Sequence, residues 1–281
     1  MIEAQEVIEF PTVEWGLSRI ECGDLQLLSE VTGLTQEECL GRLRSYRPEE
    51  FAAAWRDAGP TSPAEILDFY AHTDLYLWEL LGWNGTGGYE SYLRRVDRLA
   101  EVWPAADHPR ALDFGCGVGT AAVRLAERSY SVTIADVPGL TLTFARERLV
   151  RRGYKVEVLE IAVGEPVLRN AAWDVLVCFD VLEHVPDPAR WARNLTKALV
   201  RGGGAAIVAS FDWDDPRWPH HLADGRRRFG KGRWEMHLRG LGMANEGDCC
   251  YRRTGKTAEL ARSLQYRLWR STGLYVTRIK R

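Results

Sequence analysis

The chain has 281 residues, 46% of them hydrophobic and 27% charged, and its formal net charge is −2. These values are typical of a globular protein with a substantial core, and the length allows one large or two small domains. The weak net charge gives no indication of a nucleic-acid or membrane partner. No apolar run reaches the roughly 18 residues of a transmembrane helix, so we predict no membrane-spanning segment.

The N-terminal residues and the cysteine pattern indicate the cell compartment in which the protein is expected. The segment MIEAQEVIEF is acidic and lacks the apolar core of a secretion signal, so we expect none. Six cysteines are scattered without a CxxC pair or the Cys/His spacing of a zinc site. Two of them, Cys116 and Cys178, fall in apolar runs. This pattern favours reduced thiols over a disulfide framework, and we expect a cytoplasmic protein.

Helical signals fill the N-terminal third of the chain. Thr35-x-x-Glu38 and Ser62-Pro63-Ala64-Glu65 are typical of capping boxes, and the second has proline at the first helical position. It opens PAEILDFYAHTDLYLWELLGW (63–83), an apolar run that predicts one helix buried on several sides. Glycines in WNGTGG (83–88) end this helix, and another is predicted over 89–102.

A DNA-binding alternative exists for part of this region. Residues 27–46, LLSEVTGLTQEECLGRLRSY, resemble a helix-turn-helix with Gly33 in the turn. The second helix of such a unit brings basic and amide groups to DNA. Here it begins Gln36-Glu37-Glu38, which would repel phosphate, although three arginines follow. We therefore favour a helical lid and dimerisation domain over residues 1–104, with the Gly85–Gly88 loop as its hinge.

From residue 105 to residue 281 the pattern changes to alternating strands and helices. Short apolar runs predict strands, and helical segments separate them. The strands are expected at 110–117, 130–136, 155–161, 173–180 and 205–210, and the helices at 120–128, 140–153 and 187–204. Such alternation is typical of a parallel sheet covered on both faces. Beyond residue 211 we expect a polar, aromatic loop, a short helix near 232–241 and a final strand over 273–280.

A glycine-rich turn, LDFGCGVGT (112–120), joins the first of these strands to a helix. Such a turn lies at the carboxyl ends of parallel strands, where open sheets bind ligands. Its glycines remove Cβ atoms, so a ligand can lie against the backbone. Asp136 ends the next strand, where a carboxylate can accept both ribose hydroxyls. Asp113 would repel a pyrophosphate but can bind an ammonium group through water, so we expect a ligand with a ribose and a cationic amino-acid end.

Three motifs resemble those of the class I S-adenosylmethionine-dependent methyltransferases. LDFGCGVGT resembles their motif I, and VTIADV (132–137) is similar to their acidic second-strand end. WDVLVCFDVLEHVPDP (173–188) is similar to their fourth-strand motif in the form with Glu-His on the following turn. The resemblance covers about 105–212. It implies a Rossmann-like, seven-stranded, mostly parallel sheet with helices on both faces and a final antiparallel hairpin. S-adenosylmethionine would be the cofactor and S-adenosylhomocysteine the product.

The same resemblance implies the cofactor site. Gly115 and Gly117 would lie behind the methionine part, Asp136 would hold the ribose, and Val137 would pack on the adenine. Glu160 or Ile161 would flank the adenine edge, where the family often has aspartate, and the Phe179 backbone would meet the ammonium. The full predicted set is Asp113, Gly115, Cys116, Gly117, Thr120, Asp136, Val137, Glu160, Ile161, Phe179 and Asp180.

Methyl transfer to a hydroxyl or an amine needs a positioned acceptor and a base. Asp180, Glu183 and His184 would share a face if placed on one helical turn, and His184 could be the base. Alternatively the three resemble the metal-binding Glu-x-x-Glu-His of ubiquinone-biosynthesis O-methyltransferases and small-RNA 2′-O-methyltransferases, where a divalent cation would lower the pKa of the acceptor hydroxyl. A third alternative is that they only brace the pocket. We do not favour the metal and assign no metal ligand.

The segment 211–234 should lie over the acceptor pocket because it follows the fifth strand. Its basic run, with arginines at 226–228 and 233 and Lys231, could clamp an anionic acceptor or form a solvated surface. His220 and His221 could be a metal pair or supply a second base. Adjacent residues on an extended segment point opposite ways, so we expect only His221 to face the cofactor. The predicted catalytic residues are therefore His184, Asp180 and His221.

We predict a cytoplasmic methyltransferase that acts on a small-molecule acceptor, at a hydroxyl oxygen, and pairs into a homodimer through its N-terminal helices. One alternative is an RNA methyltransferase, supported by the basic run and YRRTGK (251–256). The net charge disfavours a nucleic-acid partner. The other alternative is a non-catalytic regulator that senses the cofactor and binds DNA through the N-terminal segment.

Overall fold

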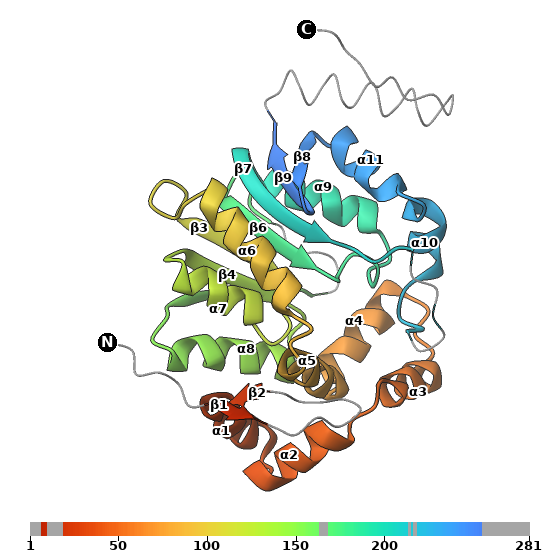
Figure 1. Ribbon diagram of the computed structural model, residues 1–281. Helices are drawn as coiled ribbons and strands as arrows, with labels where there is room; N and C mark the ends of the chain where they lie inside the picture. The colour runs from red at the N-terminus through yellow and green to blue at the C-terminus, as the bar shows by residue number, and fades with distance from the viewer. Residues whose placement is uncertain (1–6, 10–18, 163–167, 213–214, 216–217, 255–281) are drawn as a thin grey trace, which may run out of the picture.

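The computed structural model describes residues 7–9, 19–162, 168–212, 215 and 218–254. Within these ranges one seven-stranded sheet has the order β5-β4-β3-β6-β7-β9-β8 (Figure 1). Its strands are β3 (Arg110–Phe114), β4 (Ser131–Asp136), β5 (Val156–Glu160), β6 (Trp173–Phe179), β7 (Leu199–Val208), β8 (Met243–Gly247) and β9 (Cys250–Arg253). Strands β3 to β7 pair in parallel, and β9 pairs antiparallel with both β7 and β8. The predicted Rossmann-like sheet with a final antiparallel hairpin is confirmed.

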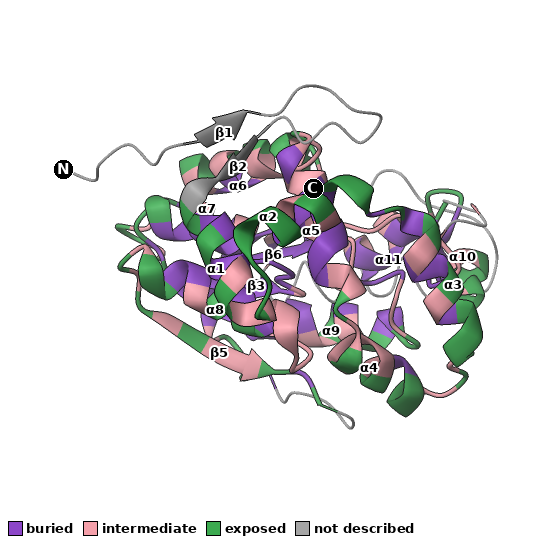
Figure 2. Ribbon diagram, turned by 90° about the horizontal axis from the view of Figure 1, so that it is seen from below, coloured by how far each residue is buried: buried purple, intermediate pink, exposed green. Residues whose placement is uncertain are grey.

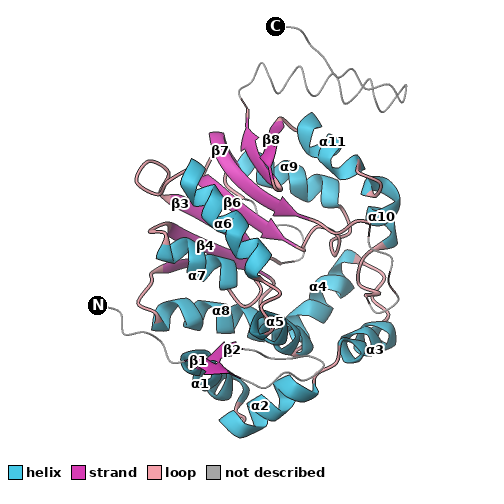
Figure 3. Cartoon of the chain, viewed as in Figure 1, coloured by secondary structure: helices cyan, strands magenta, loops and turns pink. Residues whose placement is uncertain are grey.

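Helices cover both faces of this sheet (Figure 3). One face packs against α6 (Glu90–Val102), α7 (Thr120–Glu127) and α8 (Leu140–Arg151). The other packs against α9 (Pro188–Ala198), α10 (Ala223–Phe229) and α11 (Arg233–Gly240). All seven residues of β6 are buried, as expected for a central strand covered on both sides.

The N-terminal helices lie beside the carboxyl ends of the parallel strands (Figure 1). They are α1 (Cys22–Thr32), α2 (Gln36–Ser45), α3 (Pro48–Ala58), α4 (Pro63–His72) and α5 (Leu75–Gly85), and a short hairpin of β1 (Val7–Glu9) and β2 (Arg19–Glu21) accompanies them. Leu25 and Trp78 share one buried cluster with Val118 of the glycine turn and Phe144 of α8. The inner sides of these helices are therefore buried and their outer sides exposed (Figure 2).

The predicted helix over 63–83 is wrong as a single element, because it breaks between α4 and α5. Thr73 has extended dihedrals, φ −84° and ψ 134°, and its hydroxyl accepts a hydrogen bond from the Leu75 N–H. The Asp74 carboxylate accepts one from the Trp78 indole. Short polar side chains can satisfy the backbone locally in this way and compete with the helix. The spacing of apolar residues gives no indication of this competition, so the break at Thr73 and Asp74 was not predicted.

The predicted helix over 187–204 ends early, at Ala198, and its glycine run lies in β7. A Cβ at Gly204 would come within 2.4 Å of the Trp103 ring, and one at Gly203 within 2.6 Å of the Asp174 carbonyl oxygen. These glycines allow close approach and do not stop a helix. The strand predicted over 273–280 lies outside the described residues.

The predicted helix caps are confirmed. Thr35 and Ser62 each form a complete capping box, and Gly153 after α8 has a φ of 81°. The five described cysteines, Cys39, Cys116, Cys178, Cys249 and Cys250, are free thiols. Among the helices that the structure describes, none combines the length and apolar character needed to cross a membrane.

Candidate functional site

The glycine turn between β3 and α7 needs its glycines for two reasons. Gly115, Gly117 and Gly119 have φ values of 68°, 52° and 77°, in the left-handed region that favours glycine. An added Cβ at Gly115 would also lie 2.2 Å from a Val181 methyl, and one at Gly117 would lie 2.5 Å from the Leu80 Cδ1. The turn therefore brings bare backbone into contact with the segment after β6 and with α5.

Asp136 ends β4 beside this turn. Its carboxylate accepts hydrogen bonds from the Gly117 N–H at 2.7 Å and from the Val137 N–H at 2.8 Å. Burial raises the pKa of Asp136 to about 6, although both backbone hydrogen bonds lower it. The group is thus held by two adjacent backbone segments and is ionised at neutral pH.

Two adjoining pockets extend from the turn. One, of about 40 Å³, is lined by Tyr76, Leu80, Trp83, Asn84, Tyr89, Gly115, Cys116, Gly117, Val118, Thr120, Phe179 and Asp180. The other, of about 280 Å³, is lined among others by Tyr70, Tyr76, Gly115, Asp136, Val137, Ile161, Asp180 and His184. They share Tyr76, Gly115 and Asp180. Most of the predicted cofactor residues therefore line one or the other of these two adjoining pockets.

Two predicted cofactor residues line neither pocket. Asp113 is buried below the turn, where burial and then the Asp136 charge raise its pKa to about 7. Its Oδ2 atom has no hydrogen-bond partner among the described residues. Glu160 is exposed at the end of β5, whereas the neighbouring Ile161 is buried and lines the larger pocket.

Asp180, Glu183 and His184 do not share a helical face as predicted. Asp180 has a φ of 49°, and residues 181–184 form a non-helical turn. Asp180 accepts hydrogen bonds from the Tyr92 hydroxyl at 2.5 Å and from the Ser210 hydroxyl at 3.2 Å. Glu183 accepts one from the Ser210 N–H at 2.7 Å. Burial and then the Asp180 charge raise the pKa of Glu183 to about 8, so ionisation of both carboxyls at once is disfavoured.

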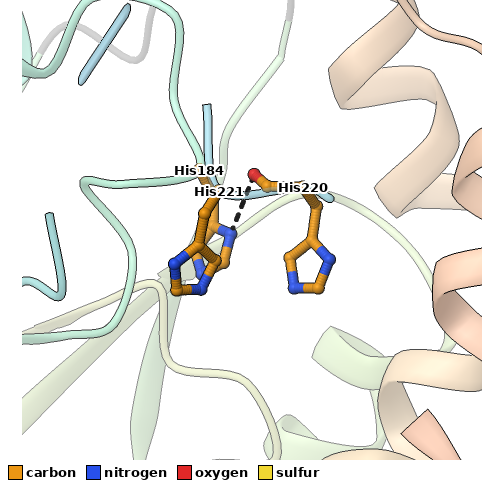
Figure 4. Close-up of side chains that lie close together, drawn as sticks. All are labelled: His184, His220 and His221. Carbon is orange, nitrogen blue, oxygen red and sulfur yellow. Dashed lines mark hydrogen bonds between the residues drawn. The ribbon is translucent and has the colours of Figure 1, made fainter. Parts of the chain in front are cut away.

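His184 instead lies with both His220 and His221 (Figure 4). Both adjacent histidines approach His184, because residues 219 and 220 form a turn and not the extended segment assumed from the sequence. Neither of them lines the two pockets, so the expectation that His221 faces the cofactor stays a prediction. Burial, and then the neighbouring histidines, hold the pKa of His184 well below its usual value. Burial lowers the pKa of His220 to about 3 and that of His221 to about 4. Burial therefore disfavours the charged form of all three rings.

The sequence did not predict that side chains of α5 and α6 contact the glycine turn and Asp180. The Asn84 amide donates to the Thr120 hydroxyl at 2.9 Å, and Leu80 faces Gly117. Tyr92 of α6 binds Asp180, as described above. The apolar, aromatic character of 63–83 was the available signal, but its spacing does not indicate which surface these side chains meet.

The comparisons with known proteins agree with this geometry. A profile of the methyltransferase domain family matches residues 112–205. The ubiquinone biosynthesis O-methyltransferase of Bordetella avium is 34% identical over 119 residues, which are 42% of this chain and 49% of that protein. Its counterpart in Escherichia coli O7:K1 is 32% identical over 125 residues, which are 44% and 52%. Residues 112–205 therefore form a domain of the methyltransferase family, similar to the class I S-adenosylmethionine-dependent enzymes.

The cofactor of this methyltransferase family is S-adenosylmethionine, which leaves as S-adenosylhomocysteine. A solved S-adenosylmethionine-dependent methyltransferase from Mesorhizobium loti has a TM-score of 0.34 and 23% identity, and the match covers 40% of this chain and 50% of that one. The chain spans about half the length of the curated relatives it matches.

The predicted anion clamp does not lie at the pockets of this methyltransferase. Arg227 of α10 pairs with Asp224, and Arg228 lies 3.9 Å from Asp187 with half of its side chain exposed. The larger pocket is instead lined by Arg190 at the start of α9. The basic run follows the surface of α10 because the chain turns into the α9 side of the sheet after His221.

Proposed function

We propose that the chain transfers the methyl group of S-adenosylmethionine to a hydroxyl oxygen of a small molecule. The observation that carries the proposal is the pair of adjoining pockets that lie between the glycine turn, Asp136, Asp180 and His184. Helices α4 and α5 line this space through Tyr70, Tyr76 and Leu80, which favours a small acceptor over a nucleic acid. Residues 1–104 would act as the lid, as predicted. Dimerisation and cytoplasmic location stay predictions.

The residues at the turn fit S-adenosylmethionine. Bare backbone at Gly115 and Gly117 would lie along the methionine part, next to the backbone of Phe179. The buried, unpartnered Oδ2 of Asp113 supports a role in holding the ammonium, through water or the turn. Asp136 would accept the ribose hydroxyls, and Val137 and Ile161 would flank the adenine. The exposure of Glu160 favours Ile161 at that edge.

The two buried carboxyl groups of Asp180 and Glu183, here called the acid pair, are better suited than His184 to remove the acceptor proton. A general base works best when its pKa lies near the working pH. The pKa of His184 is held well below neutrality, whereas burial raises the pKa of Asp180 and of its partner Glu183. We assign the base to Asp180, which lines both pockets. When bound, S-adenosylmethionine supplies a sulfonium methyl that an oxygen nucleophile displaces in line. Asp180 would take the hydroxyl proton as that bond forms.

Titration calorimetry with S-adenosylmethionine tests the cofactor part. Asp136→Ala should weaken binding at least about tenfold, because it removes hydrogen bonds to a charged acceptor. Glu37→Ala, at an exposed glutamate of α2, is the matched control and should bind as the wild type does. Glu160→Ala should also bind normally if Ile161 forms the adenine edge. A folded wild type that does not bind would contradict the proposal.

Acceptor screening by S-adenosylhomocysteine release tests the chemistry. With an acceptor in hand, Asp180→Asn should lower kcat by about a hundredfold, the usual loss for a general base. Affinity for S-adenosylmethionine should change little. If Asp180→Asn retained full kcat while His184→Gln lost it, the base would be His184 and the assignment here would fail.

A further inference from the structure

Three histidine side chains from two segments lie close together, and this group does not include Asp180 or Glu183. His184 lies in the turn after β6, and His220 and His221 precede α10. One ring nitrogen from each side chain lies within 4.8 Å of those of the other two. The His184 ring is stacked on His220, with centroids 4.9 Å apart, and is edge-on to His221 at 4.7 Å. Figure 4 shows the His184 and His221 rings overlapping in the view, with the His220 ring beside them.

We propose that His184, His220 and His221 bind one divalent transition-metal ion of the zinc class. Imidazole nitrogens suit zinc, copper and nickel, whereas magnesium and calcium need oxygen ligands. Zn–N bonds of about 2.0–2.1 Å place tetrahedral ligand nitrogens about 3.4 Å apart. Side-chain rotations that bring the rings together by no more than about 1.5 Å would meet that geometry.

The tautomer of His184 suits a metal ligand. Its Nδ1 lies 3.3 Å from the His220 carbonyl oxygen, which can only accept a hydrogen bond. Nδ1 therefore carries the proton, and the lone pair is on Nε2. Histidine ligands usually donate their other ring N–H to a carbonyl or a carboxylate in this way, which fixes the ring orientation. Here the carbonyl belongs to the segment that carries the other two histidines.

The surroundings of His220 favour an occupied site. Its ring is buried against Phe51 and Trp55 of α3, with centroids 4.6 Å and 5.9 Å away. Its Nδ1 has no hydrogen-bond partner among the described residues. A buried polar atom without a partner is unfavourable, and an apolar shell strengthens coordination of a bound cation.

This donor set differs from the one suggested by the sequence motif. Glu183 is directed to Ser210 and Asp180, so the carboxylates belong to the acid pair. The convergent group contains imidazoles alone. A softer cation than magnesium is therefore the expected ligand.

Zinc binding to the untagged full chain tests the proposal without the cofactor. After chelator treatment, calorimetry and elemental analysis should find one equivalent of Zn²⁺ per chain. His220→Gln and His221→Gln should each weaken binding at least about tenfold, the smallest loss seen when a metal site is disturbed. His72→Gln, at an exposed histidine of α4, is the matched control. Wild type that binds no zinc, or zinc binding equal in both variants and wild type, would overturn the proposal.

Cobalt(II) gives a second measurement on the unaltered chain, in case a variant does not fold. A four-coordinate nitrogen site should give intense visible absorption, whereas a loosely held six-coordinate ion is nearly colourless. Zinc should remove the absorption by displacement. A weak, six-coordinate spectrum would contradict the proposal. Failure of either test leaves S-adenosylmethionine binding unaffected, so the two proposals can fail separately.

Discussion

Buried carboxyl groups gather around the interior of this methyltransferase at the scale of single residues. Burial raises the pKa values of Asp113, Asp136 and Glu183 around the pockets, as it does that of Glu79 on α5. The buried histidines shift in the opposite direction. Stability at neutral pH is therefore a balance between acids that resist ionisation and rings that resist protonation.

Glu79 offers a clean test of this balance, because its shift has a single dominant cause. Burial raises its pKa from 4.5 to about 7, and the Tyr46 hydroxyl donates to it at 2.9 Å. The folded chain then holds a proton that the unfolded chain releases. The stabilisation is fully present below about pH 4.5 and is lost as the pH rises through 7, by up to about 3 kcal/mol.

The change to make is Glu79→Gln, which keeps an acceptor for Tyr46. Denaturant unfolding at pH 5 and pH 8 should show the wild type losing about 2.5 kcal/mol more than the variant across this range. Glu37→Gln on the surface of α2 should behave as the wild type does. Equal slopes for the wild type and Glu79→Gln would mean that Glu79 ionises normally.

At the scale of elements, the short apolar runs predicted the parallel strands well. A strand that is buried on both faces needs apolar side chains at nearly every position, so its sequence is easily recognised. Within the candidate site, the sequence predicted the glycine turn at Gly115 and Gly117 and the position of Asp136 beside it. The meeting of His184 with His220 and His221 was not predicted, since it depends on a turn that no periodicity encodes. The same holds for Leu80 against Gly117, a contact between elements that are distant in sequence.

That contact predicts the effect of Gly117→Ala. Alanine at a φ of 52° is strained by about 1–2 kcal/mol, and its Cβ would lie 2.5 Å from Leu80. Unfolding free energy should fall, and calorimetry should show weaker S-adenosylmethionine binding. Adding Leu80→Ala should recover the part due to the clash but not the part due to strain.

Gly33→Ala is the control for strain alone. Gly33 has a φ of 74°, and an added Cβ there meets nothing within 4 Å. It should lower stability by about 1–2 kcal/mol and leave cofactor binding unchanged. Normal binding by Gly117→Ala would show that α5 does not form part of the cofactor site.

At the scale of the whole molecule, the N-terminal helices and the sheet are joined by polar as well as apolar contacts. Val96, Leu99 and Trp103 of the α6 region lie in the buried cluster of the sheet, beside Val132 and Ala206. Helix α6, which belongs to the predicted 1–104 domain, thus packs directly on the sheet, and the domain boundary at residue 104 stays a prediction. Helices α1 to α5 are the part of this proposed lid that lies beside the carboxyl ends of the strands.

The buried ion pairs of Asp24 connect this lid, through Arg148, to the glycine turn. Asp24 of α1 lies 2.6 Å from Arg148 and 2.9 Å from Arg152, all three largely buried. Burial alone would raise the pKa of Asp24, but the two arginines outweigh it and hold the pKa below the usual value. Its stabilisation is thus present above about pH 4 and is lost as the pH falls through the lowered pKa. Arg148 also donates to the Thr120 hydroxyl and the Val118 carbonyl, at 2.8 Å and 3.1 Å.

Asp24→Asn should therefore act on the whole molecule. It leaves two buried guanidinium groups without their charge partner, a loss of about 3–5 kcal/mol in unfolding free energy. Because Arg148 also supports Thr120, S-adenosylmethionine binding should weaken as well. Glu30→Gln removes an exposed ion pair between the same two helices, α1 and α8, and should change neither property. If Asp24→Asn instead split denaturant unfolding into two transitions with the cofactor still bound through the first, the lid would be an independent unit whose contacts do not shape the site.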